Sequence, residues 1–148
     1  PPIRKLADTY RQLPLRNISK QILNSRRGGE TLAMIGIRKP SLHFYTKQIV
    51  FYESSAAEGV LNLFERFELD RRINFQDKPN YDNEYFLVVI DKYSSREEHW
   101  SNINHEKLGS FGIYYLWRIK KSDLNAQATD LISSGFEANW RNKQFEKF

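Results

Sequence analysis

The chain has 148 residues, of which 40% are hydrophobic, 28% charged and 14% aromatic, with seven glycines and five prolines. This size suits one domain with a buried core, and the composition excludes a disordered or low-complexity protein. No apolar run approaches the roughly 18 residues that cross a bilayer. No signal peptide is present, and the absence of cysteine excludes disulfides and Cys-ligated zinc. Because the chain begins with Pro1-Pro2 rather than Met, we expect it to be a piece of a longer protein.

The net charge of +5 is unevenly distributed along the chain. Residues 1–47 hold ten Lys and Arg against two acids, which gives +8, whereas residues 48–148 hold thirteen bases and sixteen acids, which gives −3. A basic segment on an otherwise acidic domain fits an anionic partner such as nucleic acid, a lipid headgroup or a phosphorylated substrate. A solvated helix surface explains the same pattern equally well.

The first half of the chain predicts helices alternating with short strands. Residues 1–14 form a leader or short helix, and residues 15–27 place apolar side chains at helical spacing. A buried strand is expected at 31–36, followed by a short helix that starts at Pro40. Residues 47–53 favour a strand because they are rich in β-branched and aromatic residues.

The second half continues the alternation. Ser54-Ser55 is expected to cap a helix ending near residue 70, and the polar stretch 70–84 is the expected long loop. Residues 85–90 (YFLVVI) are apolar on both faces and predict a central strand. The remaining expected elements are a helix at 94–102 capped by Ser94-Ser95, a hairpin of strands 107–111 and 113–119, and a helix capped by Ser122-Asp123 and closed by Gly135.

This order of elements predicts an α/β fold. We expect a single three-layer α-β-α domain over residues 15–148, with a mainly parallel sheet and an antiparallel C-terminal hairpin at its edge. Residues 1–14 would join this domain to a preceding segment.

Most catalytic signatures are missing from the sequence. It has no phosphate loop, no dinucleotide fingerprint, no nucleophile elbow and no H-E-x-x-H zinc motif. His99 and His105 are six residues apart, a spacing that does not put two ligands on one helix face, so we expect no metal and no cofactor. Asp91 follows the central strand and is a candidate acid, although a loop-starting Asp that bonds its own backbone is the commoner case. The run beginning at Lys107 lacks the basic-glycine start of an RNA-recognition box, so we do not expect nucleic-acid binding to be the function.

The segment from Gly36 to Ser41 is the candidate anion site. It would join the carboxyl end of a strand to the first turn of a helix, where backbone N–H groups lack partners and the helix dipole favours anions. Arg38, Lys39 and the Ser41 hydroxyl add donors at the same place. The alternative is that Pro40 and Ser41 only start the helix while both cations are solvated.

Three segments together resemble a known family: 30–52 (ETLAMIGIRKPSLHFYTKQIVFY), 112–119 (GIYYLWRI) and 135–148 (GFEANWRNKQFEKF). They are similar to the soluble C-terminal domain of bacterial, chiefly cyanobacterial, integral-membrane glycosyltransferases of the aminoarabinose transferase and protein O-mannosyltransferase class. The resemblance covers nearly all of residues 15–148 and includes no catalytic motif. Its most specific part is P-S-L-x-F-Y, formed by Pro40, Ser41, Leu42, Phe44 and Tyr45.

The resemblance implies a role that the composition does not reveal. Such enzymes use polyprenyl-phosphate-linked sugars and carry their catalytic acids in extracytoplasmic loops of a multi-span half, so no catalytic residue is assigned to this chain. The domain would face the periplasm, pack on the membrane-spanning half of the same polypeptide and contact a lipid-phosphate headgroup. The C-terminal aromatic residues would pack on the domain itself or, alternatively, on that membrane half; they are Phe136, Trp140, Phe145 and Phe148.

Two other functions remain open at this point. One is a free-standing α/β module that binds phosphate or a nucleotide near Arg38–Ser41. The other is a small enzyme that uses Asp91. The leading interpretation is an accessory domain without activity on its own.

Overall fold

The computed structural model describes the backbone of residues 2–27, 29–74 and 84–141, and within these ranges the side chains from residue 13 onward, residue 74 excepted. These residues form five α-helices, one 3-10 helix and five strands. In chain order they are α1 (Pro2–Ser25), β1 (Thr31–Ile35), α2 (Ser41–Thr46), β2 (Val50–Glu53), α3 (Ala57–Asn74), β3 (Tyr85–Asp91), η1 (Ser94–Arg96), α4 (Glu98–Ser101), β4 (His105–Phe111), β5 (Tyr114–Lys120) and α5 (Lys121–Ser133).

The five strands form one sheet in the order β2-β1-β3-β5-β4. β1 pairs in parallel with β2 and β3, whereas β5 pairs antiparallel with β3 and β4. The α/β class is therefore confirmed, but the sheet is mixed rather than mainly parallel. The cause is the order of the two hairpin strands, β4 and β5, which the tight turn at Gly112 joins. The more apolar β5 then takes the inner place beside β3, and β4 becomes an edge strand with a register shift between Lys107 and Gly109.

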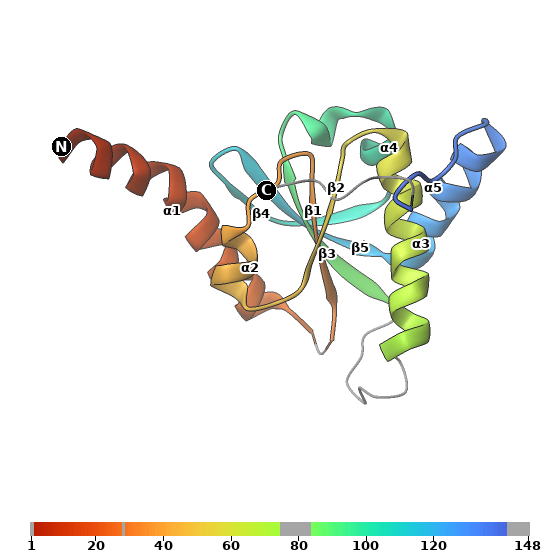
Figure 1. Cartoon of the computed structure of the whole chain (residues 1–148), viewed down its shortest axis with the longest axis horizontal. Coiled ribbons are helices and arrows are strands. Elements are labelled where there is room, and N and C mark those ends of the chain that lie inside the picture. Colours follow the sequence, from red (N-terminus) through yellow and green to blue (C-terminus); the bar gives the residue numbers. More distant parts are fainter. Residues whose placement is uncertain (1, 28, 75–83, 142–148) are drawn as a thin grey trace.

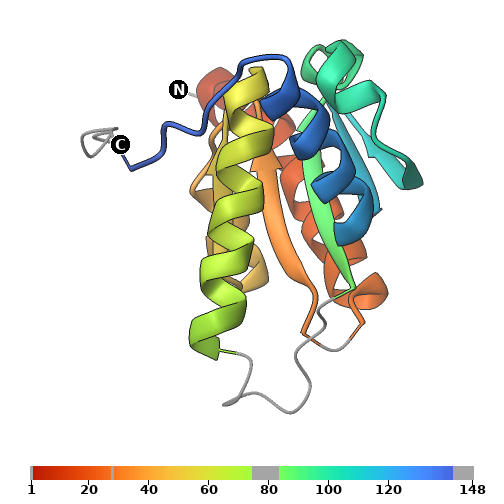
Figure 2. The ribbon, with the colours of Figure 1, turned by 90° about the vertical axis from the view of Figure 1, so that its right-hand side faces the viewer.

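Helices cover both faces of this sheet (Figures 1 and 2). Strand β3 lies at the centre and is buried on both faces from Phe86 to Asp91, as its sequence predicts. Its side chains alternate between two hydrophobic clusters. Phe86, Val88 and Ile90 join the cluster that packs under α3, α4 and α5, while Leu87 and Val89 join the one under α1 and α2.

Helix α1 is longer than the pattern predicts, because it runs without interruption through Pro14. A proline inside a helix removes one backbone hydrogen bond and crowds the preceding turn. The helix is held in spite of this by Leu15, Ile18 and Ile22, which are buried against the sheet. The expected boundary between residues 14 and 15 falls inside this helix.

Other element ends differ from the predictions for local reasons. The strand expected at 47–53 begins only at Val50, because Lys47 has a left-handed φ of 55° and ends α2. The helix expected at 94–102 is split into η1 and α4 at Glu97, whose backbone is extended. Helix α5 starts at Lys121, so Ser122 and Asp123 lie in its first turn instead of capping it. Helix α3 extends to Asn74, and most of the loop expected at 70–84 lies outside the described residues.

Candidate functional site

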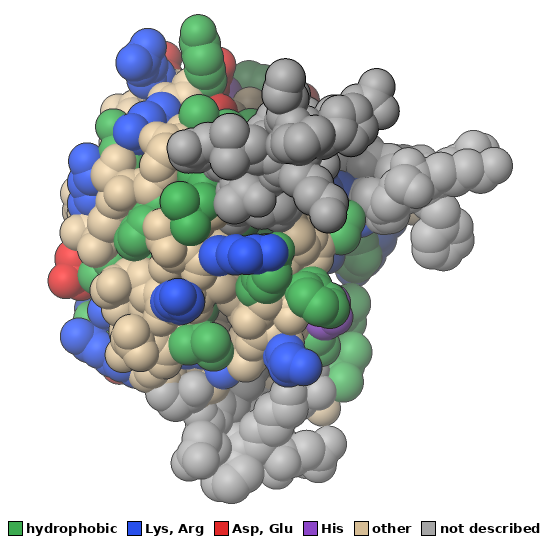
Figure 3. Space-filling view, turned by 90° about the vertical axis from the view of Figure 1, so that its left-hand side faces the viewer, with side chains coloured by type: hydrophobic (Ala, Val, Ile, Leu, Met, Phe, Trp, Pro, Cys, Tyr) green, Lys and Arg blue, Asp and Glu red, His purple; other side chains and the backbone are tan. Residues whose placement is uncertain are grey.

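The basic part of the sequence maps onto the side of the molecule formed by α1, α2 and the loop between β1 and α2. Figure 3 views the molecule from this side and shows Lys and Arg side chains interspersed with hydrophobic ones. The positive charge that is concentrated in the first part of the sequence is therefore also concentrated on this side of the folded molecule. The candidate anion site lies within this region.

The loop that carries the candidate site leaves β1 through a glycine that no other residue could replace without movement. Gly36 has a φ of +90°, and its N–H donates to the Glu53 carbonyl over 3.0 Å. A Cβ at this position would lie 2.1 Å from the Ser94 hydroxyl oxygen and 2.2 Å from a carboxylate oxygen of Asp91. This close approach holds the loop at the carboxyl edge of β1, β2 and β3.

Arg38 and Lys39 lie on this exposed loop, and Ser41 is the first residue of α2. Both cationic side chains are exposed and Ser41 is half-buried. The Arg38 guanidinium carbon lies 4.9 Å from the ring centroid of Tyr52, and the Tyr52 hydroxyl donates to the Lys39 carbonyl over 3.0 Å. Tyr52 thus contacts the Arg38 side chain through its ring and the Lys39 backbone through its hydroxyl, and anion binding at this loop stays a prediction.

Backbone groups in the first turn of α2 already have hydrogen-bond partners within the protein. The Leu42 N–H donates to the Lys39 carbonyl over 3.1 Å, and the His43 backbone hydrogen-bonds to Tyr52. An anion at this helix start would therefore be held mainly by the side chains of Arg38, Lys39 and Ser41. Burial raises the pKa of Tyr52 above its ordinary value of 10.0, and the charge of Arg38 and the bond from His43 lower it in part, so Tyr52 is a neutral hydrogen-bond donor at neutral pH.

The P-S-L-x-F-Y element forms the start and middle of α2. Leu42 is fully buried in the cluster under α1 and α2. Tyr45 is half-buried, and its hydroxyl accepts a hydrogen bond of 3.2 Å from Arg16 Nε on α1. Phe44 points outward and is 73% exposed. This element therefore fastens α2 to α1 and presents one aromatic ring to the outside, with Pro40 as the residue before the helix.

Asp91, the candidate acid, is buried and engaged within the fold. Its two carboxylate oxygens accept hydrogen bonds from the Ser94 hydroxyl (2.6 Å) and the Ser94 N–H (3.0 Å). This arrangement starts the η1 turn and corresponds to the commoner interpretation of a loop-starting Asp. Burial, and secondly the charge of Asp91, raise the pKa of the neighbouring Tyr114 above 10.0.

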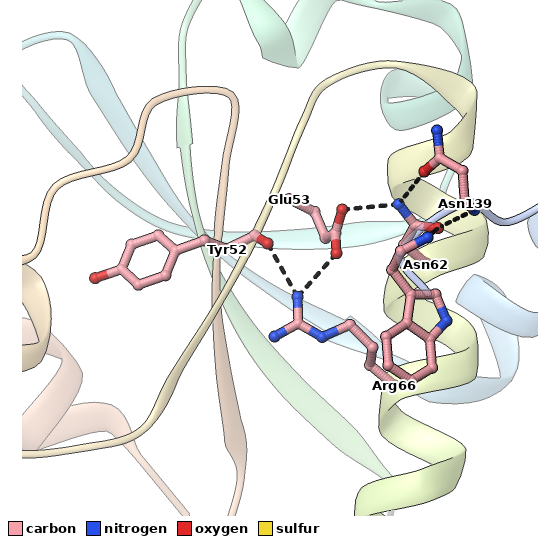
Figure 4. Close-up of polar contacts among 6 residues, drawn as sticks. Tyr52, Glu53, Asn62, Arg66 and Asn139 are labelled. Carbon is pink, nitrogen blue, oxygen red and sulfur yellow. Dashed lines mark hydrogen bonds and ion pairs between the residues drawn. The ribbon is translucent and has the colours of Figure 1, made fainter. Parts of the chain in front are cut away.

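A second polar cluster was not predicted from the sequence and joins β2, α3 and the C-terminal segment (Figure 4). The Glu53 side chain, 4% exposed, receives hydrogen bonds from Arg66 Nη1 over 2.8 Å and from Asn62 Nδ2 over 3.0 Å. Asn62 Nδ2 also donates to Asn139 Oδ1, and Asn62 Oδ1 accepts from the backbone N–H groups of Asn139 and Trp140 at 2.7 and 3.0 Å. One signal could have revealed it, because Asn62 is a polar residue inside an apolar helical run.

The same cluster binds part of the C-terminal segment to α3. The backbone N–H groups of Asn139 and Trp140 are bound to α3 through Asn62, and the Trp140 residue is half-buried. Packing of the aromatic rings on a membrane half stays a prediction. Phe136 is 40% exposed. Phe145 and Phe148 lie outside the described residues.

A buried ion pair connects the α1–β1 junction to β5. Arg118 Nε lies 2.8 Å from Glu30 Oε2 and Arg118 Nη2 lies 3.0 Å from Glu30 Oε1, with 4% and 0% of the side chains exposed. Arg118 also donates to the Ser25 carbonyl over 2.5 Å, and Glu30 Oε1 accepts the Arg27 N–H over 2.5 Å. The ion pair is bidentate, and each of its two side chains makes a further hydrogen bond to the backbone. Such additional bonds are what a buried ion pair needs to be stable.

The histidines considered for a metal have structural contacts. His99 contacts the Ser55 carbonyl, and His105 stacks on Trp117 with ring centroids 3.7 Å apart. Over the part of the chain that the structure describes, no group of three or more His, Asp or Glu side chains is arranged to hold a metal ion.

A cavity of about 370 Å³ lies between the end of α3 and the start of α5. Its described lining mixes aromatic, acidic, basic and amide side chains: Phe64, Phe67, Glu68, Arg71, Glu84, Lys120, Lys121, Ser122 and Asn125. None of the candidate site residues predicted from the sequence is among the residues that line this cavity.

Comparison with known proteins gives one match. A family model described as the C-terminal domain of the cyanobacterial RgtA-type glycosyltransferase matches residues 25–135. This span begins at the last residue of α1 and includes all five strands and α5. No curated protein and no solved structure matches the chain. Among the described residues, no helix has the length and apolar character that a bilayer-spanning segment requires.

Proposed function

Because the chain belongs to the family of cyanobacterial RgtA-type glycosyltransferase C-terminal domains, we propose that it is the accessory domain of a membrane glycosyltransferase. The family match over residues 25–135 is the observation that carries this proposal, and it confirms the resemblance found in the sequence. Two of the three resembling segments, 30–52 and 112–119, lie inside the matched span. The third begins at its last residue.

The proposal has four parts beyond membership of the family. The whole enzyme would take its sugar from a polyprenyl-phosphate carrier, the domain would lie on the extracytoplasmic face, and the three layers of the domain would pack on a membrane-spanning half of the same polypeptide. The domain would have no transferase activity alone. Its internal chemistry supports this last part, because Glu30, Glu53 and Asp91 are each bound by partners within the fold and none is left to act as an acid or base.

The proposal is tested by comparing the natural full-length polypeptide in membranes with the purified 148-residue chain. Both are supplied with a polyprenyl-phosphate-linked sugar that carries a label in the sugar, and transfer of the label to an acceptor is measured. We expect transfer by the membranes and none by the purified chain. Transfer by the purified chain would overturn the accessory role, and a coding sequence without spans of about 20 apolar residues would overturn the membrane enzyme.

A second candidate function rests on Arg38 and Lys39 on the exposed loop and on Ser41 at the start of α2. The alternative is an anion-binding α/β module that takes a phosphate or nucleotide there. Inorganic phosphate titrated into the chain should then shift the backbone amide signals of residues 36–43. The double variant Arg38→Ala plus Lys39→Ala should remove this shift.

The control for this experiment has the same change in charge. Arg71→Ala plus Arg72→Ala removes two cations at the end of α3, on the opposite side of the sheet. If both double variants weaken the phosphate-induced shifts equally, binding is non-specific and the alternative fails.

A further inference from the structure

Helices α1 and α2 together form a surface that combines cations with exposed hydrophobic side chains (Figure 3). The two helices pack against each other, and the hydrogen bond from Arg16 to Tyr45 fixes their relative position. We call this the α1–α2 surface and define it by eight exposed residues: Leu13, Arg16, Lys20, Leu23, Lys39, Phe44, Lys47 and Ile49.

The charge of this surface has one sign. Residues 13–52 contain seven Lys and Arg and a single acid, Glu30. The Glu30 side chain is 0% exposed and paired with Arg118. No exposed carboxylate therefore lies between residues 13 and 52 to neutralise the cations.

The hydrophobic members of the surface are exposed to solvent. Phe44 and Ile49 are 73% and 72% exposed, and Leu13 and Leu23 are 45% and 53% exposed. Single exposed apolar residues are ordinary, but four of them among cations form a patch of the kind that marks an interaction site. The fold creates this patch because α2 turns Leu42 into the core and thereby turns Phe44 away from it.

We infer that the α1–α2 surface lies on an anionic lipid bilayer, with its Lys and Arg side chains among the headgroup phosphates and Phe44 and Ile49 in the boundary with the acyl chains. Cations beside apolar side chains on one helical face are typical of segments that lie in the membrane interface. A nucleic acid would attract the same cations, but Phe44 is the one exposed aromatic ring among the eight residues of this surface, and its other apolar side chains are aliphatic and do not stack on bases. This inference rests on the chemistry of the surface and goes beyond the proposed function.

The experiment measures binding of the 148-residue chain to vesicles by sedimentation. One set of vesicles contains equal parts of phosphatidylglycerol and phosphatidylcholine, and the other contains phosphatidylcholine alone. We expect binding to the first set and little to the second. Binding should weaken between about 0.1 M and about 1 M salt, because the Debye length falls from about 10 Å to about 3 Å.

Two variants separate the charged from the apolar contribution. Lys39→Ala plus Lys47→Ala should lower the partition coefficient about fivefold for each cation removed. Phe44→Ser plus Ile49→Ser should lower it roughly tenfold or more, since both side chains lose their contact with the acyl region. The matched controls are on the opposite side of the sheet: Arg72→Ala plus Lys120→Ala, and Ile73→Ser plus Ile132→Ser, whose isoleucines are 61% and 55% exposed.

Several results would overturn the inference. These are equal binding to both kinds of vesicle, binding to neither, or a loss in the control variants as large as in the test variants. Binding that needs the cations but not Phe44 and Ile49 would mean adsorption by charge alone. Tighter binding to double-stranded DNA than to anionic vesicles at the same salt would assign the surface to nucleic acid. The proposed glycosyltransferase role can survive each of these results, because it is tested by sugar transfer.

Discussion

The buried pair of Glu30 and Arg118 is the clearest case in which one residue carries a measurable share of stability. Glu30→Gln removes the negative charge of the pair and leaves the guanidinium of Arg118 buried. The carboxylate of Glu106 lies 4.0 Å from this guanidinium, but its side chain is 63% exposed. Removal of one partner of such a pair costs about 3 kcal/mol or more. The free energy of unfolding, measured with urea, should fall by this amount.

Glu68→Gln is the matched control for this prediction. It breaks the ion pair of Glu68 with Arg71, whose side chains are 39% and 40% exposed. Exposed pairs contribute about 1 kcal/mol at most. An equal loss in both variants would show that burial does not set the value of the Glu30–Arg118 pair.

Tyr114 should make the protein less stable at alkaline pH. Its folded-state pKa is raised above 10.0 by burial and by Asp91, so the unfolded chain ionises first as pH rises. The stabilisation is complete below pH 10.0, the pKa of the unfolded tyrosine, and is lost as pH rises through the folded pKa. Tyr114→Phe should therefore reduce the fall in unfolding free energy above this pH, whereas Tyr93→Phe, at a side chain that is 84% exposed, should leave it unchanged. The opposite ranking of the two variants would contradict this cause.

At the scale of elements, Asn62 determines whether the C-terminal segment stays on α3. Asn62→Ala removes the acceptor of the Asn139 and Trp140 N–H groups and one donor to Glu53. We expect a loss of about 2 kcal/mol in stability and at least about tenfold faster hydrogen exchange at the two amides.

The control for this prediction is Asn125→Ala, at an exposed position of α5. Exchange at residues 139 and 140 should be the same in this variant as in the parent chain. If Asn62→Ala also leaves it unchanged, the segment is held by something other than Asn62.

The existence of most elements could be predicted from local pattern, whereas their ends and pairing could not. The run 85–90 predicts a central strand because its side chains are apolar on both faces, and β3 is central. The start of β2 and the split at Glu97 depend on backbone angles that side-chain pattern does not encode. The mixed sheet follows from which hairpin strand is inserted beside β3, a choice made by long-range burial.

The polar residues of the site could likewise be predicted only in part. Arg38, Lys39 and Ser41 could be placed together because they are adjacent in sequence. The cluster of Glu53, Asn62 and Asn139 could not, since it joins residues up to 77 positions apart. Contacts of that range depend on the complete topology of the chain.

For the whole molecule, the two hydrophobic clusters share one sheet, so we expect them to unfold together. Leu42 and Leu124 are both fully buried, on opposite faces of the sheet. Leu42→Ala and Leu124→Ala should each cost about 2 to 5 kcal/mol. Trp100 and Trp117 lie only in the cluster with Leu124, yet their fluorescence should report the loss from Leu42→Ala at the same urea midpoint as circular dichroism.

A fluorescence midpoint that stays at the parent value in Leu42→Ala, while the circular dichroism midpoint falls, would contradict this expectation. It would mean that the α1–α2 side opens without the rest of the domain. Leu124→Ala is the control in which both signals must move, because Leu124 lies in the same cluster as the two tryptophans.

The two edge strands of the sheet, β2 and β4, affect whether the protein aggregates at high concentration. β2 is an edge strand of four residues, and β4 carries exposed charged side chains and a register shift between Lys107 and Gly109. Short, charged and irregular edges are the means by which natural sheets resist adding strands from a neighbouring copy. We therefore expect the domain to resist edge-to-edge aggregation. Even at high protein concentration, the edge strands of neighbouring copies should not pair with each other.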